Sequence, residues 1–150
     1  MQEIALRVKQ IKEETAKGNG YGERVFLVAA TKMQSAERIN QAIVSGVDAV
    51  AENKVQEFRD KNERILPCSR HFIGHLQTNK VKYLVGKVEL YHSCDRDELA
   101  EELARRSQKL GIVSDILIQI NIGEEERKGG YPFEEAQEAF SVYLKKRVCA

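Results

Sequence analysis

Hydrophobic positions along the chain form short apolar runs separated by stretches with helical spacing. The first run is VFLVAA, residues 25–30, and the run richest in β-branched residues is DILIQINI, residues 115–122. Continuous apolar character is typical of parallel strands, because such strands are buried on both faces. Three further short runs are VDAVAEN at 47–53, HFIGHL at 71–76 and VELYHSC at 88–94. The pattern therefore predicts five strands.

Helical segments are predicted between these runs. Apolar residues spaced by three and four positions predict helices over residues 2–17, 36–46, 54–65 and, more briefly, 79–86. Asp95 with Glu98 three residues later forms a capping-box pair, which predicts the start of a helix that stops at Gly111. Pro132 is predicted at the first position of the last helix.

Alternation of strands and helices predicts an α/β fold built from right-handed β-α-β units around a parallel sheet. A doubly wound sheet is complete with five strands, whereas a closed (β/α) barrel of TIM type needs eight units and about 250 residues. Length alone favours the open sheet. Both architectures place their ligand sites at the carboxyl ends of the strands. The residues at those ends are Lys32, Asn53, the Gly74-His75 pair, Ser93 to Asp95, and Asn121.

Composition narrows the class of protein. With 150 residues, 42% of them hydrophobic, the chain suits one domain over residues 1–150 with a substantial core. Lys and Arg number 24 against 23 Asp and Glu, so no strong field favours nucleic acid or an anionic membrane. Cys68, Cys94 and Cys149 form no CxxC pattern, and no segment reads as a signal peptide or a membrane span. We expect a soluble cytoplasmic protein with a small-molecule partner.

Lys32 is the first candidate for chemistry. No glycine-rich phosphate loop follows the first predicted strand, so a ligand there has to be held by side chains. A lysine partly enclosed at a strand end would keep some of its amine neutral and able to attack a carbonyl, as a Schiff base requires. The alternative is a surface lysine whose stem covers apolar neighbours while its ammonium group stays in water.

Other polar residues have simpler interpretations. His71 and His75 are predicted on one face of a strand with Gly74 between them, which favours a structural or ligand-edge role over a metal site. Cys94 has no histidine and acid that would activate it, so we expect a buried thiol. The EEERK run, residues 124–128, is expected to be a solvated loop or, alternatively, a lid over the ligand.

Four motifs carry a resemblance to a known family. VFLVAATK, AENKVQE, HFIGHLQTNK and ILIQINI followed by KGGY occur in this order, as in the pyridoxal phosphate homeostasis proteins, which are related to the N-terminal barrel of alanine racemase. The resemblance extends from the first helix to about residue 140. It implies a (β/α) barrel that holds pyridoxal 5'-phosphate as a Schiff base on Lys32. It also implies Asn53 beside the cofactor, with His71 and His75 in the motif of the third strand.

The same resemblance implies a carrier of the cofactor in vitamin B6 and amino-acid homeostasis, without established catalytic turnover. The chain supplies about five of the eight units of such a barrel, so we expect an incomplete barrel. Its first and fifth strands would then expose unpaired edges, which favours self-association. Two alternatives remain. One is a truncated fragment without tight cofactor binding, and the other is a racemase-type enzyme with a second acid or base opposite Lys32.

Overall fold

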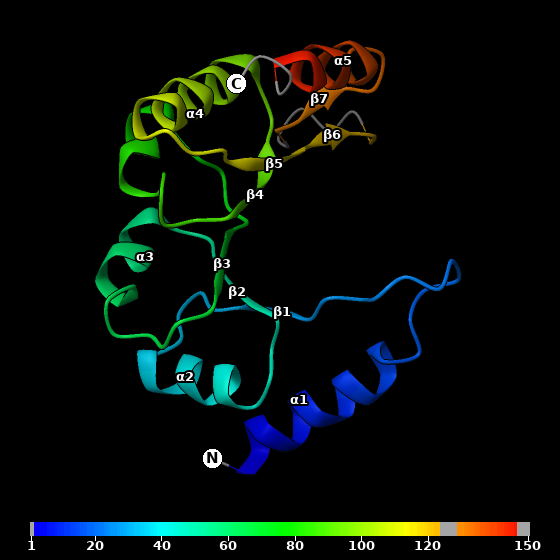
Figure 1. Cartoon of the computed structure of the whole chain (residues 1–150), viewed down its shortest axis with the longest axis vertical. Coiled ribbons are helices and arrows are strands. Elements are labelled where there is room, and N and C mark those ends of the chain that lie inside the picture. Colours follow the sequence, from blue (N-terminus) through cyan, green and yellow to red (C-terminus); the bar gives the residue numbers. More distant parts are fainter. Residues whose placement is uncertain (1, 124–128, 147–150) are drawn as a thin grey trace. The chain divides into compact units, whose positions relative to one another are not determined.

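The computed structural model describes residues 2–123 and 129–146, in which helices alternate with strands (Figure 1). The elements are α1 (Gln2–Thr15), β1 (Val28–Ala30), α2 (Ala36–Val44), β2 (Ala49–Glu52), α3 (Val55–Lys61), β3 (Ser69–Phe72), the 3-10 helix η1 (Thr78–Tyr83), β4 (Leu90–Cys94), α4 (Asp97–Leu110), β5 (Asp115–Ile118), β6 (Ile120–Asn121), β7 (Tyr131–Pro132) and α5 (Ala136–Lys146).

The strands confirm the predicted fold class. The strands β1 to β5 belong to one five-stranded sheet in sequence order, and β6 and β7 form a separate two-stranded sheet. The pairs β1–β2 and β4–β5 are both parallel. Helices connect these strands, as parallel neighbours require.

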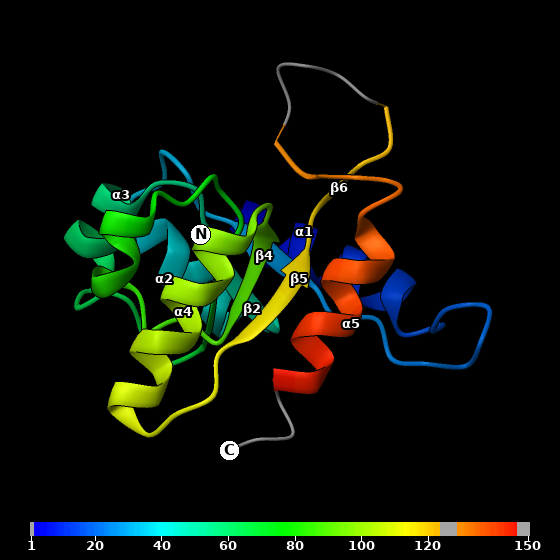
Figure 2. The ribbon, with the colours of Figure 1, turned by 90° about the horizontal axis from the view of Figure 1, so that it is seen from above.

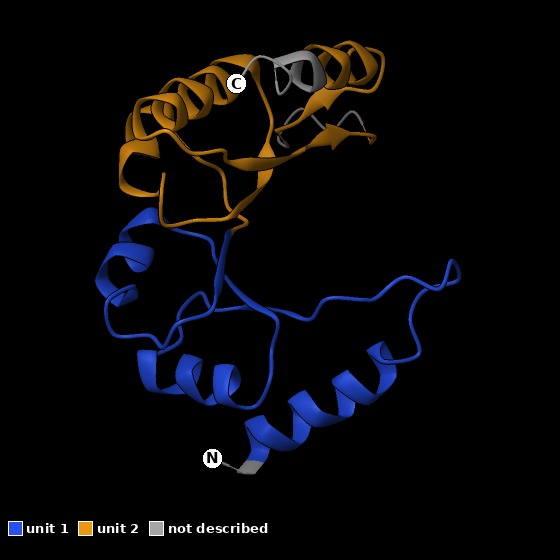
Figure 3. Cartoon of the chain, viewed as in Figure 1, with its two compact units in different colours: residues 1–71 blue, residues 72–150 orange. Residues whose placement is uncertain are grey.

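The chain divides into two compact units, residues 1–71 and residues 72–150 (Figure 3). The first unit contains β1 and β2 with the helices α1 to α3. The second contains β4 to β7 with η1, α4 and α5, and β3 crosses the boundary. The expected single domain over residues 1–150 stays a prediction.

In the first unit, Asp48 ties three segments together just before β2. Its carboxylate accepts hydrogen bonds from the Lys12 ammonium in α1 at 2.9 Å and from the Leu27 N–H at 2.8 Å, and it also pairs with Arg24. Burial by itself would raise the pKa of Asp48, but these donors outweigh it and hold that pKa below its ordinary value. The start of β1 is thereby held against the start of β2.

The helices of the first unit follow the predicted apolar stripes. The Ser35 side chain caps α2 by accepting from the Arg38 N–H at 3.4 Å, and the chain leaves the helix through Gly46, whose φ is +100°. The third helix ends at Lys61, earlier than predicted. Ile65 lies beyond it.

In the second unit, α4 has the predicted end but not the predicted start. Leu99 and Leu103 are 1% and 2% exposed, and Gly111 closes the helix in the left-handed conformation with φ +65°. The prediction of a capping box at Asp95 is wrong, because Arg96 occupies the N-cap position and makes no side-chain cap bond. The Asp95 carboxylate is instead engaged by the side chains of His75 and Arg96.

The last predicted strand is divided. Residues 115–118 pair with β4, whereas Ile120 and Asn121 pair with Tyr131 and Pro132 in the two-stranded sheet. Pro132 is therefore a strand residue, and the prediction that it begins a helix is wrong. Gly130 has a φ of +132°, and a Cβ there would lie 2.8 Å from the Asn121 backbone nitrogen, so this close approach needs glycine.

Helix α5 begins only at Ala136, after this sheet. Figure 2 shows α5 beside β5, with which it is in contact. Within residues 2–123 and 129–146, no helix combines the length and the apolar character needed to cross a membrane.

Candidate functional site

Lys32 lies in a tight turn that follows β1 directly. The turn runs from Thr31 to Gln34 and is closed by a 3.1 Å hydrogen bond from the Gln34 N–H to the Thr31 carbonyl oxygen. Met33 has a φ of +59° and is the one non-glycine residue with positive φ in the described part of the chain. A four-residue turn in which only the third residue has positive φ is of type II, and its third residue is normally glycine. The backbone around Lys32 is therefore held in an unusual conformation.

The strand register reaches the residues just before Lys32 and Asn53. Ala30 pairs with Ala51, and the Thr31 N–H continues the ladder with a 2.9 Å bond to the Ala51 carbonyl oxygen. Lys32 and Asn53 each follow the last pair by two positions, at the carboxyl ends of two neighbouring parallel strands. That their side chains are neighbours stays a prediction, because Lys32 lies in the turn after β1.

Thr31 and Glu52, which precede Lys32 and Asn53 by one position, form a buried pair. The Thr31 hydroxyl donates to Glu52 Oε1 at 2.8 Å, and the two residues are 4% and 5% exposed on the helix-covered face. Strand alternation predicts the opposite face for Lys32, which lies two positions beyond the end of β1. On that face the strands carry small side chains, Ala30 and Ala51, immediately before the candidate pair. Ala30 is exposed, whereas Ala51 is 1% exposed.

The predicted partial enclosure of Lys32 is wrong. Its side chain is exposed, as is that of Met33, at 84%. The cause is the turn, which carries both residues past the last strand residue of β1. The assignment of Lys32 therefore depends on its place in the register rather than on burial.

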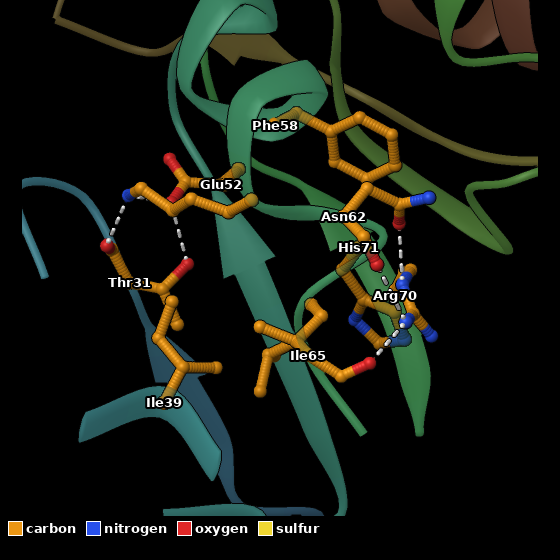
Figure 4. A pocket seen from close by; sticks show the side chains of 10 residues that line it. Thr31, Ile39, Glu52, Phe58, Asn62, Ile65, Arg70 and His71 are labelled. Carbon is orange, nitrogen blue, oxygen red and sulfur yellow. Dashed lines mark hydrogen bonds and ion pairs between the residues drawn. The ribbon is translucent and has the colours of Figure 1, made fainter. Parts of the chain in front are cut away.

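The helix-covered face has no room for a cofactor. It encloses a cavity of about 10 Å³ lined by Thr31, Glu52, Phe58 and Lys61 among others (Figure 4). A cavity of this size holds one water molecule at most. This cavity therefore cannot hold a cofactor.

A larger hollow of about 390 Å³ lies beside the end of α1. Two of its cationic residues, Lys12 and Arg24, are paired with Asp48. These charges already serve the packing of α1, so this hollow is a weaker candidate for an anionic ligand.

Asn53 is half-buried immediately after β2. Its backbone N–H donates to Glu52 Oε2 at 3.1 Å, so the buried carboxylate also fixes the chain at this position. A carboxamide beside an amine can both donate to and accept from a polar ligand.

The two histidines of the third motif lie in different surroundings. His71 is half-buried in β3, with its Nε2 atom 3.2 Å from the Ser69 hydroxyl. His75 lies beyond the strand, 65% exposed, with Nδ1 3.1 Å from Asp95 Oδ2. The prediction that they share a strand face is wrong, because β3 ends at Phe72. His71 belongs to the first unit and His75 to the second.

Cys94 is a buried thiol, as predicted. It is 1% exposed, and burial, aided by the charge of Asp95, raises its pKa to about 11. Such a thiol is protonated at neutral pH and is not a nucleophile. Cys149 and the predicted loop or lid at residues 124–128 lie outside the described residues.

Lys61 is a residue of this region that the motifs do not indicate. Its ammonium group lies 2.7 Å from Glu52 Oε1, 2.7 Å from Glu57 Oε2 and 3.1 Å from the Thr31 carbonyl oxygen. The spacing of Glu57 and Lys61 by four positions in a predicted helix was the signal available in the sequence.

Comparisons with known proteins bear on the family and the fold. No family model matches the sequence. The pyridoxal phosphate homeostasis protein of Aquifex aeolicus is 42% identical over 143 residues, which cover 94% of this chain and 61% of that protein. The protein of the same name from Escherichia coli K12 is 32% identical, with 92% and 63% covered.

Solved structures show the same fold. PipY, the COG0325 family member of Synechococcus elongatus PCC7942, superimposes without PLP at a TM-score of 0.82, with 27% identity over 93% of this chain and 63% of that one. The form with PLP bound gives a TM-score of 0.79 at 26% identity.

Fold and site together define an α/β chain of the parallel (β/α) barrel class with a lysine at the end of its first strand. The resemblance seen in the motifs is confirmed, and the chain is a relative of the pyridoxal phosphate homeostasis proteins. It spans about 61% of the length of the Aquifex protein.

The ion pairs behind Lys32 predict that the free energy of unfolding decreases as the pH falls. Hydrogen bonds from Lys61 and from the Met33 N–H lower the pKa of Glu57. A lowered pKa contributes stability above the unfolded value of about 4.3, and this contribution is lost as the pH falls through the folded value. Urea unfolding between pH 6 and pH 3 should therefore show a smaller loss of stability for Glu57→Gln than for the unchanged protein.

The matched control is Glu101→Gln, at an exposed glutamate in α4. It should keep the acid dependence of the unchanged protein. Equal acid dependence in Glu57→Gln and the unchanged protein would contradict the pairing.

Proposed function

We propose that this chain binds pyridoxal 5'-phosphate at the sheet face that carries Lys32 and Asn53, and that it takes part in intracellular vitamin B6 and amino-acid homeostasis in the cytoplasm. One observation carries the proposal. The parallel pairing of β1 with β2, which runs to Ala30 and Ala51, supports a shared site for Lys32 and Asn53, the residues that the family resemblance assigns to the cofactor.

The residues present fit this ligand. Pyridoxal phosphate supplies an aldehyde, which a lysine amine can join through a C=N bond with loss of one water molecule. The Lys32 amine is accessible, and the Asn53 carboxamide beside it offers a donor and an acceptor. The family resemblance places His71 and His75 in the motif of the third strand. We include them in the proposed site on that ground alone.

Two tyrosines of the second unit, Tyr91 and Tyr131, are poorly placed to serve as the second acid or base of a racemase-type enzyme. Such an enzyme needs a second acid or base, and a tyrosine is a usual choice. The Tyr91 side chain is 2% exposed, and burial raises its pKa. The Tyr131 hydroxyl donates to Asp97 Oδ1 at 2.8 Å. Neither phenol is free to exchange a proton with a ligand.

The decisive test is covalent trapping. The purified chain is mixed with pyridoxal phosphate and reduced with borohydride, and the pyridoxyl group is located by mass spectrometry. We expect it on Lys32, with loss of the label in Lys32→Ala, because the amine supplies the bond. The matched control is Lys109→Ala, at an exposed lysine in α4, which should keep the label on Lys32.

Other outcomes favour the alternatives. If Lys32 of the unchanged protein never acquires the label, the chain is a fragment without tight cofactor binding. If the loaded protein interconverts D- and L-alanine, it is an enzyme of the racemase type.

Self-association is the second part of the proposal. The second unit exposes large apolar side chains at Leu117, Ile122, Phe133 and Phe140, with exposed fractions of 48%, 78%, 67% and 56%. Large apolar side chains left exposed to this degree favour association. Sedimentation velocity should show dimers or larger species that dissociate on dilution, and a monomer at all concentrations would contradict this part.

A further inference from the structure

A partly buried ionic cluster lies directly behind the turn that carries Lys32. Its cation is Lys61 at the end of α3, whose side chain is 14% exposed, and its anions are Glu52 and Glu57. Both Lys61–carboxylate distances are 2.7 Å. Such short contacts are typical of strong charge-assisted hydrogen bonds.

The cluster holds the turn on both sides of Lys32. Before Lys32, the Lys61 ammonium group donates to the Thr31 carbonyl oxygen at 3.1 Å. After Lys32, the Met33 N–H donates to Glu57 Oε2 at 2.8 Å, and the same oxygen atom accepts from Lys61. The two peptide groups that flank Lys32 are therefore linked through one ammonium group.

Electrostatics keep this link intact at neutral pH. Burial alone would lower the pKa of Lys61, but its hydrogen bonds and charge interactions with Glu52 and Glu57 raise it overall. The pKa of Glu57 is lowered by the same contact. Lys61 thus stays charged and Glu57 stays ionised over the physiological range.

The conformation of Met33 explains why such a link is needed. A non-glycine residue with a φ of +59° carries strain of about 1 kcal/mol or more, and it persists only where its surroundings hold it. The hydrogen bond to Glu57 supplies that constraint. Without the constraint, the turn can relax and Lys32 can leave its place opposite Asn53.

We propose that Lys61 is a positioning residue for Lys32: through Thr31 and Glu57 it fixes the turn that presents the Lys32 amine on the face it shares with Asn53. The part that concerns the cofactor rests on the proposed function. The part that concerns the turn does not.

The geometry distinguishes this role from core stabilisation. A cluster that served stability alone would need only the Lys61–Glu52 pair. Here the bonds extend to backbone atoms on either side of Lys32, at Thr31 and Met33. The predicted effect of removing Lys61 is therefore local to the turn.

The first test measures the turn without cofactor. Amide hydrogen exchange is followed by NMR at Met33 and, as an internal control, at Ile39, whose N–H donates to the Ser35 carbonyl oxygen at 3.1 Å within α2. In Lys61→Met we expect exchange at Met33 to become about ten-fold faster while Ile39 is unchanged, since a lost charged hydrogen bond corresponds to roughly that factor. Lys61→Arg should retain slow exchange, because guanidinium can reach the same acceptors.

A variant with both charges removed keeps the test possible if Lys61→Met does not fold. Lys61→Met leaves Glu52 buried without its cation, which is destabilising. If Lys61→Met does not fold, the double variant Lys61→Met, Glu52→Gln removes both charges and should still show faster exchange at Met33. Equal slowing or equal acceleration at Met33 and Ile39, or no change at either, overturns the proposal.

The second test uses the cofactor. In Lys61→Met, the pyridoxal phosphate concentration that half-labels Lys32 under borohydride should rise about ten-fold, because a misplaced amine reacts less well, and Lys61→Arg should restore labelling. An unchanged half-labelling concentration with faster exchange at Met33 overturns the positioning role. Failure of the unchanged protein to label Lys32 overturns the proposed function, and the exchange experiment then decides the role of Lys61 in the turn.

Discussion

A buried hydrogen bond between the Thr31 hydroxyl and the Glu52 carboxylate aligns the end of β1 with the end of β2, one residue before Lys32 and Asn53. Side chains alternate along a strand, so a slip of one residue would move Lys32 to the helix-covered face. That face encloses only about 10 Å³ of free space. The bond sits where β1 ends against β2, and the same carboxylate accepts from the Asn53 N–H. One buried contact therefore fixes both members of the candidate site.

A buried carboxylate such as that of Glu52 is stable only with a cation beside it. The cation here also holds the turn after β1, so the stability of the fold and the position of the Lys32 amine depend on the same residue. Lys61 neutralises Glu52 and also bonds to the Thr31 carbonyl oxygen and to Glu57. The packing of α3 on the sheet therefore also determines the conformation of the turn after β1. A residue in the packed layer acts on the exposed face through the backbone, without touching the ligand.

The sequence predicted the alternation of strands and helices because burial on both faces leaves a continuous apolar run, as at β2, where every residue is buried. It also predicted that Lys32 and Asn53 follow the ends of the first two strands, as they do. The start of α4 and the role of Pro132 could not be predicted, because Asp95 is engaged by side chains distant in sequence and Pro132 pairs with a short strand. The exposure of Lys32 depends on a turn with positive φ at a methionine, a conformation that no residue pattern indicates.

The central claim is that Lys32 and Asn53 are neighbours on the face opposite Glu52. It is tested most directly by nuclear Overhauser spectroscopy on the isotopically labelled chain without cofactor. The account predicts contacts between the β-protons of Lys32 and the side-chain amide protons of Asn53. Contacts from Lys32 to the side chain of Glu52 or Phe58, with none to Asn53, would contradict it.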